Sequence, residues 1–324
     1  MKIFVSSMFK GDFVQPGYRI RRNLVSIYEL LGYEVTDELD ETVHIAQFIG
    51  VENNKENISL CVEKYKINTI INYFIDSSVF NKNGEAKLSF EDKKYLNKAN
   101  LVIVPTQFDK NILLENEITT RIEIVSPGIN LSKFTKLSDI EKESFLKYSG
   151  LIKGEPFVLA ISRFKCVKDI QDIALLARRL PYLKFYVFGP GISLFKTSHK
   201  ILRQLPFLPK NMMIKSYINE DFYKSAVLLA KFMYITRDTN CDILNILDGK
   251  LSKTQIITIS SIEANKSLID GVNCICKDSP GLLSLEMQKV MSGEYSTIDE
   301  AYKEVQNESY ELISKKMESL IKEL

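Results

Sequence analysis

Three basic residues follow an apolar segment in the middle of the chain, and their spacing suits them to binding an anion. Arg163, Lys165 and Lys168 come directly after residues 157–161, which have the length and composition of a buried strand. In an open parallel sheet, ligands bind in the crevice at the carboxyl ends of the strands. Cations at such a point favour a phosphate ligand. A solvated basic loop would fit the same residues, and both interpretations stay open here.

The segments around this basic loop form a strand–helix–strand unit. Residues 157–161 and 185–188 are apolar runs of strand length, and apolar side chains recur at helical spacing over residues 170–180. A unit of this kind, within about 35 residues, is a βαβ crossover with an expected right-handed connection. The stretch 156–191 therefore predicts the start of a parallel α/β domain.

Composition limits the class of protein. The chain has 324 residues, which indicates about two domains, and its net charge of +2 is too small for bulk nucleic-acid binding. Its five cysteines form no CxxC pair and it has two histidines, so we expect no zinc or disulfide framework and a reducing compartment. No signal-peptide pattern and no long apolar segment is present. We expect a cytoplasmic protein, with contact to a membrane surface left open.

The first half of the chain alternates between strand and helix patterns. Thr106 and Asp109 have the spacing of a helix capping box, and Gly32 stands where a helix should end. The expected strands are 2–6, 33–36, 42–45, 69–74, 101–104 and 122–125, and the expected helices are 19–31, 59–65 and one within 76–99. This pattern predicts a first α/β domain over residues 1–150.

The second half repeats the alternation. A helix that runs into a strand is expected over 225–234, a helix over 242–251, and strands over 255–259 and 271–276. These complete a second domain over residues 151–305. Residues 306–324 carry one apolar stripe at helical spacing, which predicts a terminal amphipathic helix that docks on a domain. The predicted fold class is α/β with two Rossmann-like domains.

One stretch, residues 196–215, mixes basic and bulky apolar side chains. Such a mixture can lie on an anionic membrane surface, which makes the stretch a candidate for peripheral membrane contact. A loop and helix packed against the second domain would explain the same residues. Both interpretations are kept.

Several short motifs occur in a fixed order along the chain. They are Pro105-Thr106, Lys110, Pro127-Gly128, Asn130, Phe134, Ser162-Arg163, Lys168, Phe188-Gly189 and the turn Asp270-Gly271-Val272-Asn273. Their order and spacing resemble the GT-B glycosyltransferases, and more closely retaining glycosyltransferase family 4, also called glycosyltransferase group 1. The resemblance covers nearly the whole chain. It implies two Rossmann-like domains that face a central cleft.

The resemblance also implies roles for the basic loop. In that family, cations after the first strand of the second domain bind the diphosphate of a nucleotide-sugar donor, and Arg163 and Lys168 are the matching residues. The leaving diphosphate gains negative charge as the glycosidic bond breaks, so fixed cations stabilise the transition state. Such enzymes need no metal, and no strand-end DxD pair is present. We expect no cofactor besides the donor.

The chain departs from the family at its most characteristic motif, a pair of glutamates separated by seven residues. Asn240 and Asp248 stand at those positions, so the spacing is kept in a degenerate motif. The first position touches the donor sugar in the family and the second touches the nucleotide ribose. Asn72 or Phe74 stands where a histidine is common in the first domain, and Glu263 lies where a glycine-rich phosphate loop is usual.

The predicted function is that of a retaining glycosyltransferase that uses a nucleotide-diphosphate sugar. The acceptor is expected to be a glycolipid or another cell-envelope glycan. The alternative is a catalytically silent GT-B-like partner or regulatory protein, which the degenerate motif favours. The sequence names neither the donor sugar and base nor the acceptor.

Overall fold

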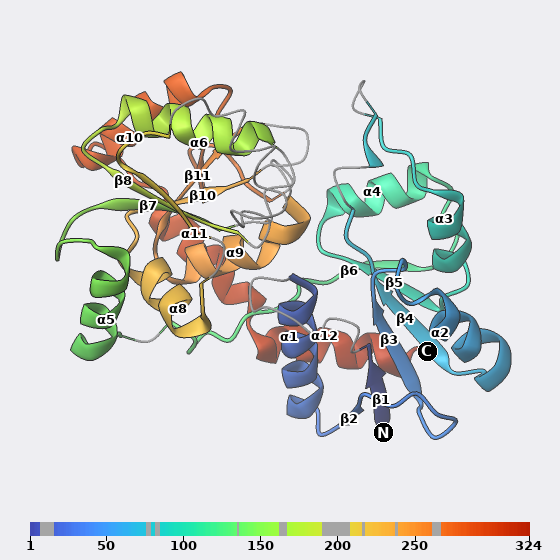
Figure 1. The fold of residues 1–324 in the computed structure, drawn as a ribbon. Coiled ribbons are helices and arrows are strands. Elements are labelled where there is room, and N and C mark those ends of the chain that lie inside the picture. Colours follow the sequence, from blue (N-terminus) through green and yellow to red (C-terminus); the bar gives the residue numbers. More distant parts are fainter. Residues whose placement is uncertain are drawn as a thin grey trace. The chain divides into compact units, whose positions relative to one another are not determined.

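The computed structural model describes residues 1–6, 16–75, 79–81, 85–134, 136–161, 167–189, 208–215, 218–236, 239–260 and 267–324. The chain forms two compact units. The first comprises Met1–Asn130 and Glu308–Leu324, and the second comprises Leu131–Asn307. Within the described residues, each unit contains one six-stranded sheet in which neighbouring strands run parallel (Figure 1). The α/β prediction is therefore confirmed.

In the first unit, the strand order is β2-β1-β3-β4-β5-β6. The strands are β1 (Lys2–Val5), β2 (Glu34–Thr36), β3 (Ile45–Ile49), β4 (Asn68–Asn72), β5 (Leu101–Val104) and β6 (Ile122–Ile124). The helices are α1 (Pro16–Leu30), α2 (Lys55–Ser59), the π-helical turn η1 (Leu60–Tyr65), α3 (Phe90–Leu96), α4 (Gln107–Glu115) and α12 (Tyr310–Lys322).

The core of the first unit lies between the sheet and the helices α2, α3 and α4. Phe4, Phe48, Ile71 and Val102 point from the strands into this core, where the buried Leu113 of α4 joins them. On the other side, α1 contacts β1 and β3, and the C-terminal helix α12 packs beside α1 (Figure 1). The end of the chain thus belongs to the unit that its beginning forms.

In the second unit, the strand order is β12-β11-β10-β7-β8-β9. The strands are β7 (Phe157–Ile161), β8 (Lys184–Phe188), β9 (Met212–Lys215), β10 (Phe232–Ile235), β11 (Gln255–Ile259) and β12 (Ile275–Lys277). The helices are α5 (Asp139–Ser149), α6 (Val167–Arg179), α8 (Glu220–Leu229), α9 (Thr239–Leu251), α10 (Pro280–Met291) and α11 (Ile298–Val305). Helices α6 and α10 cover one face of the sheet, and α8, α9 and α11 lie on the other (Figure 1).

Several predicted elements match the structure residue for residue. Strands 101–104, 157–161 and 255–259 are β5, β7 and β11. The Thr106 side chain accepts a hydrogen bond from the backbone N–H of Asp109 at 3.1 Å and so caps α4 as expected. Gly32 follows α1 with a φ of +71°. Long apolar runs and strong local capping signals account for this agreement.

Two strands cover other residues than predicted. The strand expected at 42–45 is β3, Ile45–Ile49, because the apolar run continues through Phe48 and all five residues are buried. The strand expected at 271–276 is the shorter β12, Ile275–Lys277, because Asp270 to Asn273 form a turn. No element is expected over residues 280–305, yet α10 and α11 form there.

The compact units divide between Asn130 and Leu131, earlier than the domain boundary expected at residue 150. The reason is that α5 packs against α8 of the second unit, with Phe145 buried beside Phe157 and Phe222. The second unit ends at Asn307, close to the expected 305, and residues 308–324 return to the first unit.

The candidate membrane stretch 196–215 is described only from residue 208 onward. Its last four residues form β9, which pairs with β8, and Met212 is buried in the core of the second unit. Residues 212–215 are therefore structural, whereas residues 196–207 lie outside the described part of the chain.

Candidate active site

The strand order of the second unit creates a topological switch point between β7 and β10. From β7 the chain proceeds to β8 and β9 on one side, whereas β10 is followed by β11 and β12 on the other. The connections that leave the carboxyl ends of β7 and β10 therefore diverge, and this is the place where open α/β sheets bind ligands. The basic loop follows β7 and α9 follows β10, so the sequence candidates flank this switch point.

The structure describes these candidates to different extents. Arg163 lies in 162–166, outside the described residues, as do Ile262 and Glu263. Lys168 is the second residue of α6 and is exposed. Asn240 is the second residue of α9, and its side chain lies outside the described part. The site that is described is therefore built around Asp248.

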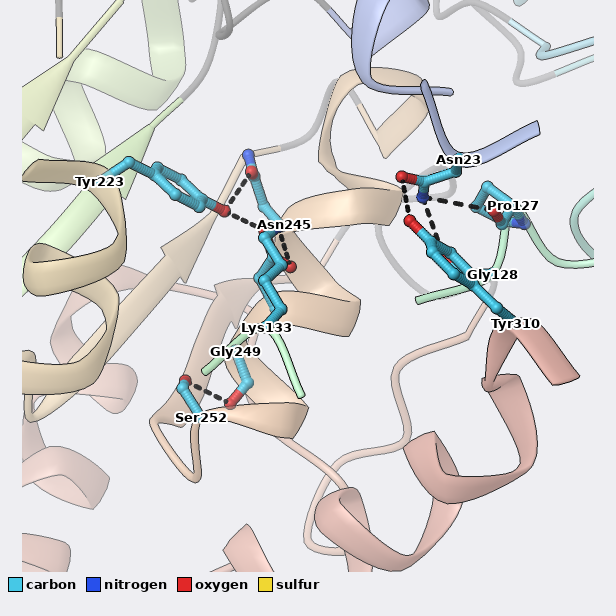
Figure 2. A network of polar contacts seen from close by, with 10 residues as sticks. Asn23, Pro127, Gly128, Lys133, Tyr223, Asn245, Gly249, Ser252 and Tyr310 are labelled. Carbon is cyan, nitrogen blue, oxygen red and sulfur yellow. Dashed lines mark hydrogen bonds and ion pairs between the residues drawn. The ribbon is translucent and has the colours of Figure 1, made fainter. Parts of the chain in front are cut away.

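Asp248 is buried in a polar network on the inner side of α9. Its side chain is 1% exposed, and the Lys133 ammonium lies 2.8 Å from Oδ1 and 3.0 Å from Oδ2. The Tyr223 hydroxyl of α8 also donates a hydrogen bond to Oδ2. The same ammonium lies 5.6 Å from the centre of the Tyr223 ring, within the range of a cation–π contact. Figure 2 labels Lys133 and Tyr223.

Asn245 connects this network to the end of β7. It lies one helical turn before Asp248, and its Oδ1 lies 3.1 Å from the Tyr223 hydroxyl oxygen, so Asn245 and Asp248 share the single hydroxyl proton (Figure 2). Its Nδ2 donates to the backbone carbonyl of Ile161, the last residue of β7, at 2.9 Å. We call Lys133, Asp248, Tyr223, Asn245 and the Ile161 carbonyl the Asp248 network. It joins α9 to β7 across the switch point.

Helix α9 can place these side chains because it packs closely on the sheet. A Cβ at Gly249 would lie 3.1 Å from Sδ of Met233 on β10 and 3.3 Å from Cγ1 of Ile256 on β11, so glycine allows this approach without displacing these side chains. The end of α9 is held by the buried Lys250, whose ammonium lies 2.7 Å from Oε2 of Glu304 on α11. The position of α9 on the sheet thus sets the geometry of the Asp248 network.

The Asp270–Asn273 turn, one of the motifs in the sequence, supports the same region. Asn273 is 2% exposed, and its Nδ2 donates to Oε2 of Glu304 at 2.8 Å. Gly271 has a φ of +75°, which explains the glycine in this turn. The motif therefore helps to fix Glu304, the partner of Lys250.

The first unit has its own switch point, between β1 and β3, with β2 on the opposite side of β1. A buried polar chain connects α1 to the middle of β3 and to the end of β4. Tyr28 of α1 donates to the Gln47 side chain, and Gln47 donates to Oδ1 of Asn72 at the end of β4. The Ser6 hydroxyl accepts a hydrogen bond from the Ile49 backbone at 3.2 Å. Burial raises the pKa of Tyr28, which keeps its hydroxyl a donor.

Asn72 is one of the two residues expected in place of the family's histidine. It is 5% exposed, and its Oδ1 accepts the hydrogen bond from Gln47. Phe74 follows β4 and is partly exposed. At the start of α1, Arg19 is 5% exposed and Arg21 forms an ion pair with Asp37.

The Pro127-Gly128 turn is fixed by residues from both ends of the chain. Asn23 of α1 donates to the carbonyls of Pro127 and Gly128 at 3.3 and 2.7 Å, and the Tyr310 hydroxyl of α12 donates to Oδ1 of Asn23 at 2.7 Å (Figure 2). Backbone hydrogen bonds also join Ile129 to Glu308 and Tyr310. This motif therefore docks the C-terminal helix within the first unit.

In the part of the chain that the structure describes, no group of three or more His, Cys, Asp or Glu side chains is arranged to hold a metal ion. Among the same residues, no helix is long and apolar enough to cross a membrane.

Sequence reasoning missed Lys133, Tyr223 and Asn245. One signal for Asn245 was available, since Asn245 and Asp248 are polar residues three apart within an apolar segment of α9. Lys133 and Tyr223 lie far from Asp248 in the sequence, and no local pattern indicates their contact.

No family model matches the chain. A curated relative, the processive diacylglycerol alpha-glucosyltransferase of Acholeplasma laidlawii, is 27% identical over 161 residues, which are 49% of this chain and 48% of the relative. The match thus spans about half the length of that relative.

Solved structures match over the whole chain. The sucrose-phosphate synthase of Thermosynechococcus elongatus has a TM-score of 0.77 at 12% identity, over 100% of this chain and 98% of that chain. HepE of Anabaena, in complex with UDP and glucose, has a TM-score of 0.70 at 12% identity, over 100% of both chains. Together with the two parallel sheets, these likenesses show that the chain has the GT-B fold of glycosyltransferases.

Proposed function

We propose that this protein is a glycosyltransferase that takes a hexose from a nucleotide-diphosphate sugar. The observation that carries the proposal is the position of the basic loop. It follows β7 at the switch point of the second unit in a GT-B fold. Support comes from the relative named as a diacylglycerol glucosyltransferase and from the solved neighbour in complex with UDP and glucose.

In this proposal, the second unit binds the donor. Arg163 and Lys168 hold the diphosphate, because a leaving group that gains negative charge is stabilised by fixed cations. Asn240, at the start of α9, contacts the donor sugar, for which an amide can both donate and accept hydrogen bonds. Asp248 supports the donor site from the same helix. Transfer is metal-independent and retains the anomeric configuration, with positioning and electrostatics as the main sources of catalysis.

The first unit binds the acceptor, and Asn72 ends β4, the strand next to β3 at its switch point. We propose a lipid or glycolipid acceptor, because the curated relative is named for diacylglycerol. Another cell-envelope glycan fits the same fold. Residues 196–207 are proposed to supply peripheral contact with an anionic membrane.

The test is a transfer assay with UDP- and GDP-sugars, starting with UDP-glucose, and diacylglycerol in mixed vesicles as the acceptor. We expect a glycosylated lipid whose anomeric configuration, read by NMR, is that of the donor. Arg163→Ala should lower turnover about 100-fold, as removal of a transition-state donor does. The control is Arg179→Ala, since Arg179 is exposed at the far end of α6. Absence of both turnover and nucleotide binding in the wild type would reject the proposal.

A second candidate function is a GT-B-like partner protein without catalysis. The burial of Asp248 against Lys133 favours it, because the residue at the ribose-reading position already has a charged partner. This candidate predicts that Arg163→Ala leaves the cellular function unchanged and that the protein co-purifies with another chain. A large loss of cellular function on Arg163→Ala would count against it.

A further inference from the structure

We propose that the second unit binds a single-chain amphiphilic anion in a cavity at the amino end of β7. The ligand has an apolar chain and a head group that is a carboxylate or a phosphate monoester. The cavity lies at the opposite end of β7 from the switch point, and its described lining contains none of the residues proposed for the donor site. The inference therefore goes beyond the proposed function, and its failure would leave that function untouched.

The cavity has a volume of about 610 Å³, which lies within the usual range for sites that bind small molecules. Three segments form it: one face of α5, residues 153–157 that lead into β7, and residues 229–231 at the end of α8. Helices α5 and α8 pack side by side (Figure 1). The backbone N–H of Lys231 donates to the carbonyl of Phe157 at 3.0 Å, which joins two of these segments. The cavity is thus built within one compact unit.

The most deeply buried residues of the lining are apolar. Phe157 is 1% exposed and Ala230 is 8% exposed, whereas Leu146, Pro156 and Leu229 are half-buried. The half-buried leucines leave apolar surface in contact with water at the cavity. An alkyl chain bound there would remove that surface from water, together with its own. The inner part of the cavity therefore suits the chain of an amphiphile.

Two of the three acidic residues in the lining already have partners in the protein. The Lys142 ammonium lies 3.3 Å from Oδ1 of Asp139, one turn away on the same face of α5. Oε1 of Glu155 lies 3.9 Å from the Lys184 ammonium, and its Oε2 accepts a hydrogen bond from the backbone of Ile152 at 3.2 Å. These acids therefore do not neutralise the other cations of the lining.

The remaining charged residues of the lining are Lys153, Lys231 and Glu143. Their side chains form no ion pair within the described part of the chain. Two cations thus accompany one acid, and a single negative charge on a ligand would balance them. Lysine side chains can lay their apolar stems on a ligand while the ammonium groups contact its head group. The charges at the cavity therefore favour an anionic head group.

Titration calorimetry with octanoate and octyl phosphate, below their micelle concentrations, tests the proposal. We expect one molecule to bind per chain, and the tighter of the two anions identifies the head group. From hexanoate to decanoate, each added methylene group should tighten binding about threefold, because it removes more apolar surface from water. Octylammonium, which has the same chain and the opposite charge, should bind at least about fivefold more weakly than the tighter anion.

A charge reversal tests the two free lysines. In Lys153→Glu/Lys231→Glu, the anions should bind at least about tenfold more weakly than in the wild type, and octylammonium should become the tighter ligand. The matched control is Lys147→Glu/Lys210→Glu, which has the same net charge. Both of these lysines are exposed, and neither belongs to the described lining of the cavity. The control should change the affinity for the anions less than about twofold.

A second variant tests the position of the apolar chain. Leu229→Trp places an indole in the cavity and should abolish binding of the anions, because it occupies the space for the chain. Leu114→Trp is its control, since Leu114 is 54% exposed on α4 of the first unit. That variant should bind the anions as the wild type does. Thermal unfolding of all variants shows that they are folded at the temperature of the titrations.

Three results would overturn the inference. The first is a wild-type protein that binds neither octanoate nor octyl phosphate, or takes them up without saturation. The second is equal affinity for the anions and for octylammonium, which would remove the role of the lysines. The third is undiminished binding in Leu229→Trp, which would place the amphiphile elsewhere on the protein.

Discussion

The ammonium of Lys133 lies 2.8 Å from Oδ1 of Asp248 across a sequence separation of 115 residues. Lys133 is 21% exposed and Asp248 is 1% exposed, so the pair is largely withdrawn from water. Asp248 thus has a counter-ion from the start of the second unit. This pair gives Asp248 a structural function that its place in the sequence does not indicate.

Removing Lys133 should destabilise the second unit strongly. Lys133→Met leaves the Asp248 carboxylate buried without its counter-ion, and we expect a loss of about 3 kcal/mol in the free energy of unfolding. Asp248→Asn should lower the free energy of unfolding by less, because Lys133 can still reach water.

The measurement is urea unfolding of the two single variants and the double variant. The loss of free energy in the double variant should be well below the sum of the losses in the single variants. Additive costs would contradict a direct interaction. The control is Lys303→Met, from an exposed pair with Glu300 on α11, which should leave the free energy of unfolding nearly unchanged.

Gly128 should tolerate substitution less well than Gly32 and Gly50, the other glycines with a positive φ in the described part of the first unit. It has a φ of +72°, and an added Cβ would lie 3.1 Å from the Tyr310 ring and 3.2 Å from Ile27. Gly128→Ala therefore adds crowding to backbone strain, and we expect a loss of about 2–3 kcal/mol with faster hydrogen exchange in α12. Gly32→Ala is the control, since Gly32 has a φ of +71° and an added Cβ would meet nothing within 4 Å. Its cost should be about 1 kcal/mol. Equal costs for the two variants would show that the contact with Tyr310 is unimportant.

Glu286 should contribute to stability at neutral pH and lose that contribution in acid. Hydrogen bonds from the Tyr295 hydroxyl and the Lys289 ammonium lower the pKa of Glu286. A lowered folded-state pKa stabilises the fold above the unfolded-state pKa of about 4.3, and this stabilisation disappears as the pH falls through the folded-state value. Glu286→Gln should therefore be less stable than the wild type at pH 7, by less than about 1 kcal/mol, and equally stable near pH 2. A difference that grows in acid would contradict this assignment. The readout is urea unfolding across that pH range.

The buried cysteines should react slowly with thiol reagents in the native protein. Burial raises the pKa of Cys61 and that of Cys274 to about 12, so little thiolate is present at pH 8. In a Cys166→Ser/Cys241→Ser background, we expect labelling of Cys61 and Cys274 at least about 100-fold slower than in urea. Mass spectrometry of the labelled peptides gives the rates. Fast native labelling of Cys61 would show that the core beneath η1 opens readily.

The sequence predicted those elements whose signals are local. Uninterrupted apolar runs located β5 and β7 to the residue, the largely apolar segment QIITI located β11, and Thr106 located the start of α4. The order of motifs also indicated the GT-B fold. These features depend on side-chain spacing within one segment, which a single sequence displays directly.

The contacts around Asp248 could not be predicted in the same way. Lys133, Tyr223 and Asp248 come from three separate segments, and only the packing of α8 and α9 in the folded unit brings them together. Strand β9 was missed for a related reason, since Met212 and its neighbours resemble an amphipathic surface until their pairing with β8 is known. The Asn130–Leu131 division likewise depends on α5 packing against α8.

A crystal structure with the bound nucleotide diphosphate would test the central claim most directly. We predict that the diphosphate lies at the carboxyl end of β7, within hydrogen-bond distance of Arg163 and Lys168, while Lys133 remains paired with Asp248. A nucleotide bound elsewhere, with no cation from residues 162–168 near its phosphates, would contradict the account.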